Sequence, residues 1–136
     1  MPSITVSEAI GRPVPFAELI GFEVTQRAAG SARVELALRP EHMNSWDVAH
    51  GGVVMTLADV ALAVAARTMD AASNGAITVG MSLTFIGAGK GRLVAEARCL
   101  RYGATLAFCE GEIRDGDGTL VAKAVGTFKM RRGREP

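Results

Sequence analysis

Aromatic side chains are scarce in this sequence: Phe, Tyr and Trp make up 5% of it, although hydrophobic residues make up 49%. The core must therefore be built from Val, Leu, Ile, Ala and Met, which pack small elements closely.

Long apolar runs are also missing, since no window reaches the roughly 18 apolar residues that a membrane span needs. No N-terminal stretch combines a positive start, an apolar run and a cleavage site. We expect a cytoplasmic protein with no membrane partner.

Charge of one sign is not in excess either, because 15 Lys and Arg residues stand against 14 Asp and Glu residues. This balance produces no field strong enough to attract nucleic acid, so we expect no such partner.

The two cysteines, Cys99 and Cys109, lie in apolar, strand-like segments without the spacing of a redox motif or a zinc site. We interpret both as reduced core thiols, and we expect no metal.

A length of 136 residues fits a single domain over 1–136, with 1–15 as an N-terminal arm and 131–136 as a basic tail. A long segment from Val53 to Met69 predicts a helix that is apolar nearly all round and so buried on every side. Alternating polarity and glycine-rich turns predict strands, which span 32–38, 76–86, 92–102, 105–114 and 120–130. Short links favour antiparallel pairing in a meander. We expect an α+β fold with about five strands around one long central helix.

Asp59 interrupts this apolar helix. A buried carboxylate is costly without a partner, and its neighbours one helical turn away carry no positive charge: Met55, Thr56, Leu62 and Ala63. Something outside the helix must therefore explain it. One interpretation is structural, either a hydrogen bond to a backbone group or an exposed stripe of the helix. The other is a general base or nucleophile, the kind of group found in active sites.

His50, Gly51 and Gly52 precede the helix. Free N–H groups point outward at a helix N-terminus and the helix dipole favours negative charge there, so such donors can stabilise the oxyanion of an acyl transfer. Taken alone, two glycines before a helix also fit a simple turn. Gly52 and Asp59 are seven residues apart, about 10 Å along the helix axis. A catalytic base acts within about 3 Å of its target, so one chain cannot easily offer both groups to one carbonyl.

Two copies of the helix, antiparallel across a two-fold axis, would remove this difficulty. The Gly51 end of one copy would then meet Asp59 of the other, and two equivalent sites would form. The spacing therefore predicts a homo-oligomer in which catalysis requires the dimer.

Asn44, then His50-Gly51-Gly52, then Asp59 resemble the N-x5-HGG-x6-D signature of PaaI-type thioesterases in the hydroxybenzoyl-CoA thioesterase superfamily. Segments 78–85 and 117–124 also resemble strands of that family. The resemblance implies the hotdog fold and an acyl-CoA thioesterase that hydrolyses an acyl- or aryl-acyl-CoA to the free acid and CoA. It implies no cofactor, because CoA is part of the substrate. It also implies shared sites in a dimer or a dimer of dimers, that is, a homotetramer.

The resemblance gives Asp59 the role of activating water or attacking the thioester itself, and the sequence does not choose between these. It gives Gly51 the N–H that polarises the thioester carbonyl, with Gly52 beside it in substrate binding. His50 would support the loop, or it would merely hydrogen-bond a backbone carbonyl.

Asn44 would contact the carbonyl or the water, and Thr78 would help to hold the attacking water. Each also has a simpler interpretation. Asn44 fits an ordinary loop residue. Thr78 alternates in step with Gly80, Ser82 and Thr84, so it can face solvent or a subunit contact instead.

Two departures from the family pattern affect the loop and the CoA site. Asp47 stands where relatives often have Gly, a change that affects the loop conformation and the local charge. The basic residues that often follow the glycine at position 103 are missing, which leaves Lys90, Arg92 and the C-terminal tail as substitutes for binding the CoA phosphates. Two alternative functions stay open: a hotdog hydratase or dehydratase acting on enoyl or hydroxyacyl thioesters, and a non-catalytic acyl-CoA-binding protein.

Overall fold

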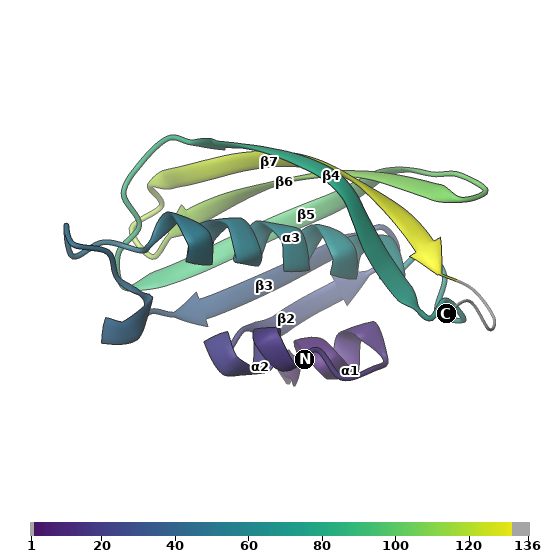
Figure 1. Cartoon of the computed structure of the whole chain (residues 1–136), viewed down its shortest axis with the longest axis horizontal. Coiled ribbons are helices and arrows are strands. Elements are labelled where there is room, and N and C mark those ends of the chain that lie inside the picture. The colour runs from purple at the N-terminus through teal and green to yellow at the C-terminus, as the bar shows by residue number, and fades with distance from the viewer. Residues whose placement is uncertain (1, 132–136) are drawn as a thin grey trace.

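A computed structural model describes residues 2–131, in which one antiparallel sheet wraps around the long helix α3 (Gly51–Arg67) (Figure 1). The sheet has seven strands: β1 (Ile4–Thr5), β2 (Glu23–Ala28), β3 (Ser31–Ala37), β4 (Gly75–Phe85), β5 (Arg92–Tyr102), β6 (Leu106–Asp115) and β7 (Leu120–Arg131). Two short helices, α1 (Val6–Ile10) and α2 (Pro15–Ile20), and the 3-10 turn η1 (Pro40–His42) complete the fold. The α+β prediction is confirmed, with seven strands instead of about five.

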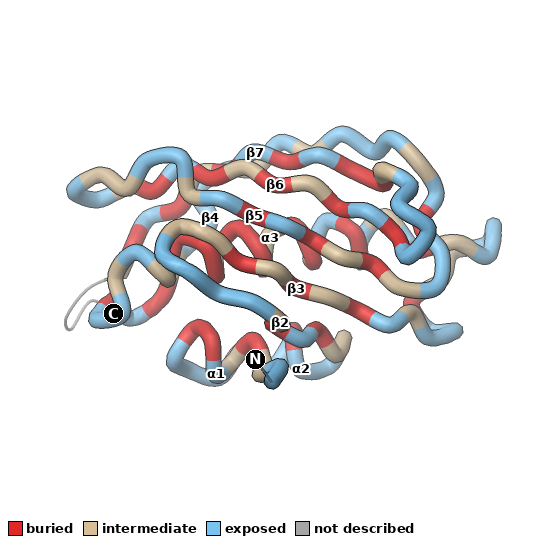
Figure 2. The backbone as a smooth tube through the Cα atoms, turned by 180° about the vertical axis from the view of Figure 1, so that it is seen from behind, coloured by how far each residue is buried: buried red, intermediate tan, exposed pale blue. Residues whose placement is uncertain are grey.

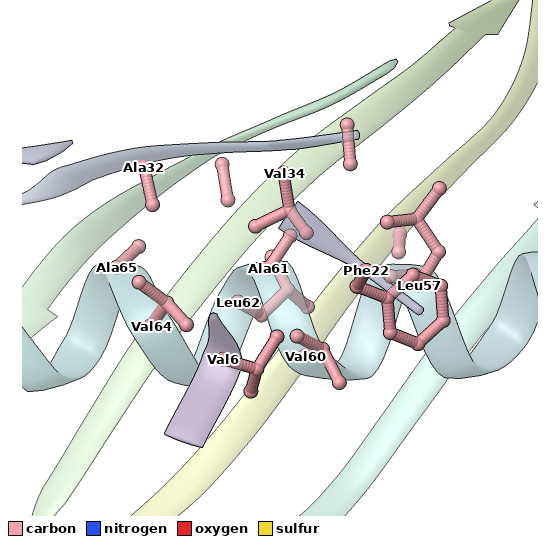
Figure 3. Close-up of a cluster of buried hydrophobic side chains, with 14 of the residues drawn as sticks. Val6, Phe22, Ala32, Val34, Leu57, Val60, Ala61, Leu62, Val64 and Ala65 are labelled. Atoms are coloured by element: carbon pink, nitrogen blue, oxygen red, sulfur yellow. The ribbon is translucent and has the colours of Figure 1, made fainter. Parts of the chain in front are cut away.

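The two additional strands come from the N-terminal part of the chain. Strand β1 has two residues, and in β2 only Val24 is buried, so neither shows the alternation that marks a strand. Helix α1 packs against α3, and Figure 3 shows Val6 of α1 beside Val60 of α3. The segment predicted as an arm is therefore part of the folded domain over its described residues. The basic tail lies outside them, apart from Arg131, which ends β7.

The strands lie in the order β1-β2-β3-β5-β6-β7-β4. The predicted meander holds for β5, β6 and β7, but β4 pairs with β7 rather than with β5. The segment 86–91 therefore carries the chain from β4, an edge strand, past β7 and β6 to β5 in the middle of the sheet. This placement sets the inner face of β4 beside α3 (Figure 1).

Helix α3 packs closely on the sheet because the strands beneath it carry small residues. A Cβ atom at Gly126 would lie 3.0 Å from Cδ1 of Leu62, and one at Gly111 would lie 3.2 Å from Cδ2 of the same side chain. These distances leave no room for larger residues at positions 111 and 126. Most of the helix is buried against the sheet, as the labelled cluster in Figure 3 shows.

One stripe of α3 is not covered, which corrects the prediction of a helix buried on every side. The less buried positions recur at intervals of three or four residues, and they include Gly52, Met55, Thr56, Asp59 and Ala63. Figure 2 shows the outer face of the sheet, where buried and exposed positions alternate along β5 and β6. Within residues 2–131, no helix has the length and apolarity needed to cross a membrane.

Candidate active site

The loop that leads into α3 is built around Asn44. Its Oδ1 accepts hydrogen bonds from the N–H of Trp46 (2.8 Å) and of Val48 (3.3 Å). The N–H of Asp47 donates to the carbonyl of Asn44 at 3.1 Å. Asp47 adopts a φ of 59°, a left-handed conformation that glycine adopts freely. The loop thus keeps the shape that suits glycine at position 47, and Asn44 holds it through its own side chain.

A second histidine, which the sequence did not single out, anchors this loop. His42 is 2% exposed. Its Nδ1 accepts from the N–H of Arg39 at 3.0 Å, so Nε2 carries the proton and donates to the carbonyl of Ile20, also at 3.0 Å. The carbonyl of His42 accepts the N–H of His50 at 2.9 Å. His42 therefore positions the start of α3, and no periodicity in the sequence marks such a role.

His50 caps α3. Its Nδ1 accepts the N–H of Gly52 at 2.8 Å, and its carbonyl accepts the N–H groups of Val53 (2.9 Å) and Val54 (3.2 Å). Within residues 2–131 the Gly51 N–H has no acceptor. Of the two glycine amides at this helix end, only that of Gly51 is thus free to bind a ligand, because the His50 side chain engages the amide of Gly52.

The free amide is bordered by an aromatic ring. A Cβ atom at Gly51 would lie 3.4 Å from Cε1 and Cζ of Phe85, the last residue of β4. The ring is 53% exposed and so forms an open apolar wall beside the N–H group. An apolar wall reduces competition from water for the donor, which strengthens its interaction with a carbonyl oxygen.

Asp59 has its partner on β4. The Thr78 hydroxyl donates to Asp59 Oδ1 at 2.6 Å, a length typical of a hydrogen bond to a charged oxygen. Asp59 is half-buried and lies on the uncovered stripe of α3, the position that the sequence analysis left open for it. A strand that packs beside the helix therefore supplies the partner that the helix itself lacks.

A β-bulge decides which way Thr78 faces. Thr78 pairs with Phe128, whereas Gly80 pairs with Thr127, so Val79 is the extra residue on β4. The extra residue shifts the alternation by one. Thr78 thus shares the inner face with Met81, and the predicted in-step alternation with Gly80 is wrong.

The structure brings the site residues together in two groups. One is the capped helix end, with Asn44, His50, Gly51 and Gly52. The other is the pair of Asp59 and Thr78, eight residues further along the helix from Gly51. At about 1.5 Å per residue the two groups are roughly 12 Å apart along the axis. A single chain does not place the free amide and the carboxylate around one carbonyl.

Of the basic residues suggested for CoA binding, Arg92 is already engaged. Its Nε donates to Glu35 Oε1 at 2.7 Å, and Thr25 donates to the other carboxylate oxygen, also at 2.7 Å. Partial burial raises the pKa of Glu35, but the hydrogen bonds from Arg92 and Thr25 outweigh it, so the pKa lies below the ordinary value. Lys90 stays a predicted contact for the CoA phosphates.

Among residues 2–131, no group of three or more His, Cys, Asp or Glu side chains is arranged to hold a metal ion.

The family model of the thioesterase superfamily matches residues 47–122, which include His50, Gly51, Gly52, Asp59 and Thr78 but not Asn44. This chain belongs to the thioesterase superfamily. It is therefore a hydrolase that acts on thioesters. Curated relatives agree: a protein of Archaeoglobus fulgidus named as a candidate esterase is 34% identical over 114 residues, which cover 81% of this chain and 71% of the relative. One of Deinococcus radiodurans, named in the same way, is 37% identical over 119 residues, 85% of this chain and 79% of the relative.

Solved structures share the hotdog fold. A conserved protein of Pseudomonas aeruginosa superposes with a TM-score of 0.81 at 30% identity, covering 90% of this chain and 97% of that one. The PaaI protein of the Escherichia coli phenylacetic acid operon superposes with a TM-score of 0.83 at 22% identity, covering 93% and 91%. A Streptococcus pneumoniae thioesterase solved with coenzyme A gives 0.75 at 23% identity, covering 85% and 89%. The predicted fold is thus confirmed.

Proposed function

We propose that this thioesterase hydrolyses acyl-CoA, with Asp59 as the general base or nucleophile and the Gly51 N–H as the donor to the thioester carbonyl. The observation that carries the proposal is the hydrogen bond of 2.6 Å from Thr78 to Asp59 on the uncovered stripe of α3. It fixes the orientation of an accessible carboxylate, as a catalytic base requires. A solved neighbour that contains coenzyme A supports CoA as the thiol.

The chemistry follows from the two groups. The thioester oxygen accepts the Gly51 N–H, which stabilises the negative charge that develops on it. Thr78 engages Oδ1 of Asp59, so Oδ2 is left to take a proton from water while the water oxygen attacks the carbonyl carbon. The C–S bond then breaks, the thiolate takes the proton from Asp59, and free acid and CoA leave. In the nucleophilic alternative, Oδ2 attacks the carbon, the C–S bond breaks and CoA leaves as a thiolate. Water then hydrolyses the mixed anhydride to the free acid and the Asp59 carboxyl, which gives its proton to the thiolate.

The roughly 12 Å between Gly51 and Asp59 along the helix supports a site shared between two copies of the chain. The uncovered stripe of α3 adjoins β4, an edge strand; Met55 on the stripe is 43% exposed, and Phe85 at the end of β4 is 53% exposed. A second chain that covers this surface would bury its apolar side chains. It would also bring its own Gly51 to the Asp59 of the first chain. A dimer, or a dimer of dimers, is therefore the proposed catalytic unit.

A pair of variants at position 51 tests the donor. Gly51 is the first residue of α3, where proline is tolerated, and His50 has φ −62° and ψ 137°, a conformation allowed before proline. Gly51→Pro removes the N–H and should lower kcat roughly 100- to 1000-fold, the usual effect of losing one oxyanion donor. Gly51→Ala keeps the N–H and adds a Cβ in ordinary contact with Phe85, 3.4 Å away, so it is the matched control. Equal losses in the two variants would contradict the assignment.

Thiol release from a panel of acyl-CoAs by the wild-type chain and Asp59→Asn tests the reaction itself. The proposal requires turnover by the wild type and its loss in the variant. Binding of acyl-CoA without thiol release would support the non-catalytic alternative. Hydration of enoyl-CoA with the thioester left intact would support the hydratase instead.

A further inference from the structure

The two cysteines lie opposite each other on adjacent strands of the sheet. Cys99 on β5 and Cys109 on β6 are direct register partners, and partners on adjacent strands project to the same face. Both thiols are free. The N–H of Cys99 donates to the carbonyl of Gly30 at 2.8 Å and not to Cys109. The pair is therefore a non-hydrogen-bonded one, the kind in which opposed side chains lie closest.

This geometry suits a covalent bond. Cα atoms of a non-hydrogen-bonded pair lie about 4.5 Å apart, which falls inside the range of about 4.4 to 6.8 Å found across disulfides. One residue beyond Cys99, the register of β5 shifts between Cys99 and Arg101, so Leu100 is an extra residue. A bulge bends and loosens its strand locally. Closing an S–S bond therefore needs little movement of the rest of the sheet.

The two sulfurs differ in environment. Cys109 is 1% exposed, and burial, followed by the neighbouring Cys99, raises the pKa of its thiol to about 12. Cys99 is only half-buried, and its Sγ donates to the carbonyl of Arg101 at 3.5 Å. An oxidant can therefore reach Cys99, while Cys109 stays protonated beside it. An accessible thiol next to a protected one matches the division between an attacking and a resolving cysteine.

We propose that Cys99 and Cys109 form a redox pair that closes to an intrachain, cross-strand disulfide when the protein meets a hydroperoxide. The Cys99 thiolate attacks one peroxide oxygen, the O–O bond breaks, and a sulfenic acid and a hydroxide form. The Cys109 sulfur then attacks the sulfenic sulfur, and the S–OH oxygen leaves as water with the thiol proton. In sum, two thiols and one hydrogen peroxide give one disulfide and two waters. The bond ties β5 to β6 beside the bulge and is independent of the catalytic assignment.

The test uses the full wild-type chain treated with hydrogen peroxide, and then with dithiothreitol. Thiol titration in denaturant should find two thiols before treatment, none after it, and two again after reduction. The intact mass should fall by two hydrogen atoms, and the chain should stay monomeric on a non-reducing denaturing gel. A peptide joining Cys99 to Cys109 should appear in a non-reducing digest.

Cys99→Ser and Cys109→Ser are the matched variants, and neither should show the loss of two hydrogens. Cys109→Ser should instead gain oxygen at Cys99, since the resolving thiol is missing. The proposal is overturned if the wild type keeps both thiols. It is equally overturned if the wild type gains oxygen at Cys99 without closing the bond, or if it loses its thiols only through links between chains. These readouts come from the wild-type chain, so they do not depend on how well the variants fold.

Discussion

Thr78 reaches Asp59, at 2.6 Å, because β4 carries one extra residue at Val79. With regular alternation, Thr78 would share its face with Ser82 and Thr84, which pair with Val125 and Lys123 on the outer side of the sheet. The bulge turns Thr78 inward while the rest of the strand keeps its pairing. A local irregularity of one strand thus provides the only hydrogen bond found for the Asp59 carboxylate among residues 2–131.

Thr78→Val should lower kcat because it removes the hydroxyl while keeping the branched shape. A hydrogen bond to a charged group contributes about 1.5 to 3 kcal/mol, which corresponds to a loss of roughly tenfold to a hundredfold. Thr78→Ser should retain most of the activity, and Thr84→Val on the outer face should change little. A Thr78→Val enzyme with wild-type kcat would show that this hydrogen bond is structural only.

Asp47→Gly should stabilise the protein. Asp47 is the one non-glycine residue with positive φ among residues 2–131, at 59°, and left-handed backbone costs an L-residue about 1 kcal/mol. Part of the gain is offset by the greater freedom of glycine in the unfolded chain, so we expect the Tm to rise by about 2 °C. Asp117→Gly is the control, since Asp117 lies in another exposed turn without positive φ. Calorimetry that showed equal effects of the two changes would contradict the strain at position 47.

Glu35 should stabilise the fold at neutral pH and lose this effect in acid. Its pKa is lowered in the folded state, so its contribution is present above the ordinary value of 4.5 and disappears as the pH falls through the folded value. The Tm of Glu35→Gln should therefore lie below that of the wild type near pH 7, and the two should converge in acid. Glu41→Gln, whose side chain is 68% exposed, should show little difference at either pH. A Glu35→Gln difference that grows in acid would contradict the sign.

The sequence predicted the ends of the central helix and of the five long strands to within about two residues. Alternating polarity and glycine-rich turns mark these strands. The sequence could not predict β2, where only Val24 is buried. It could not place β4 at the far edge of the sheet either, since strand order depends on which faces pack together. The candidate site shows the same contrast. Asp59 and Gly51 were predicted as site residues from their local pattern, whereas the orientation of Thr78 depends on a bulge that no periodicity reveals.

His42 illustrates the same limit. Its role rests on contacts with the backbone of Arg39, Ile20 and His50, which only folding brings together. Cys99 and Cys109 were read as reduced core thiols, and their direct pairing depends on the register of β5 and β6. The roles of these residues depend on contacts that only the folded chain makes, so the sequence alone could not predict them.

The most direct test of the shared site mixes two inactive variants. Gly51→Pro chains keep Asp59 and Asp59→Asn chains keep the Gly51 N–H, so a mixed dimer contains one intact site if each site draws on both chains. Co-expressed at equal amounts with different tags, the variants should recover about a quarter of wild-type thiol release, because half of the dimers are mixed and each has one site of two. Mixed dimers that form, as shown by tandem purification, yet release no more thiol than either variant alone would contradict the shared site.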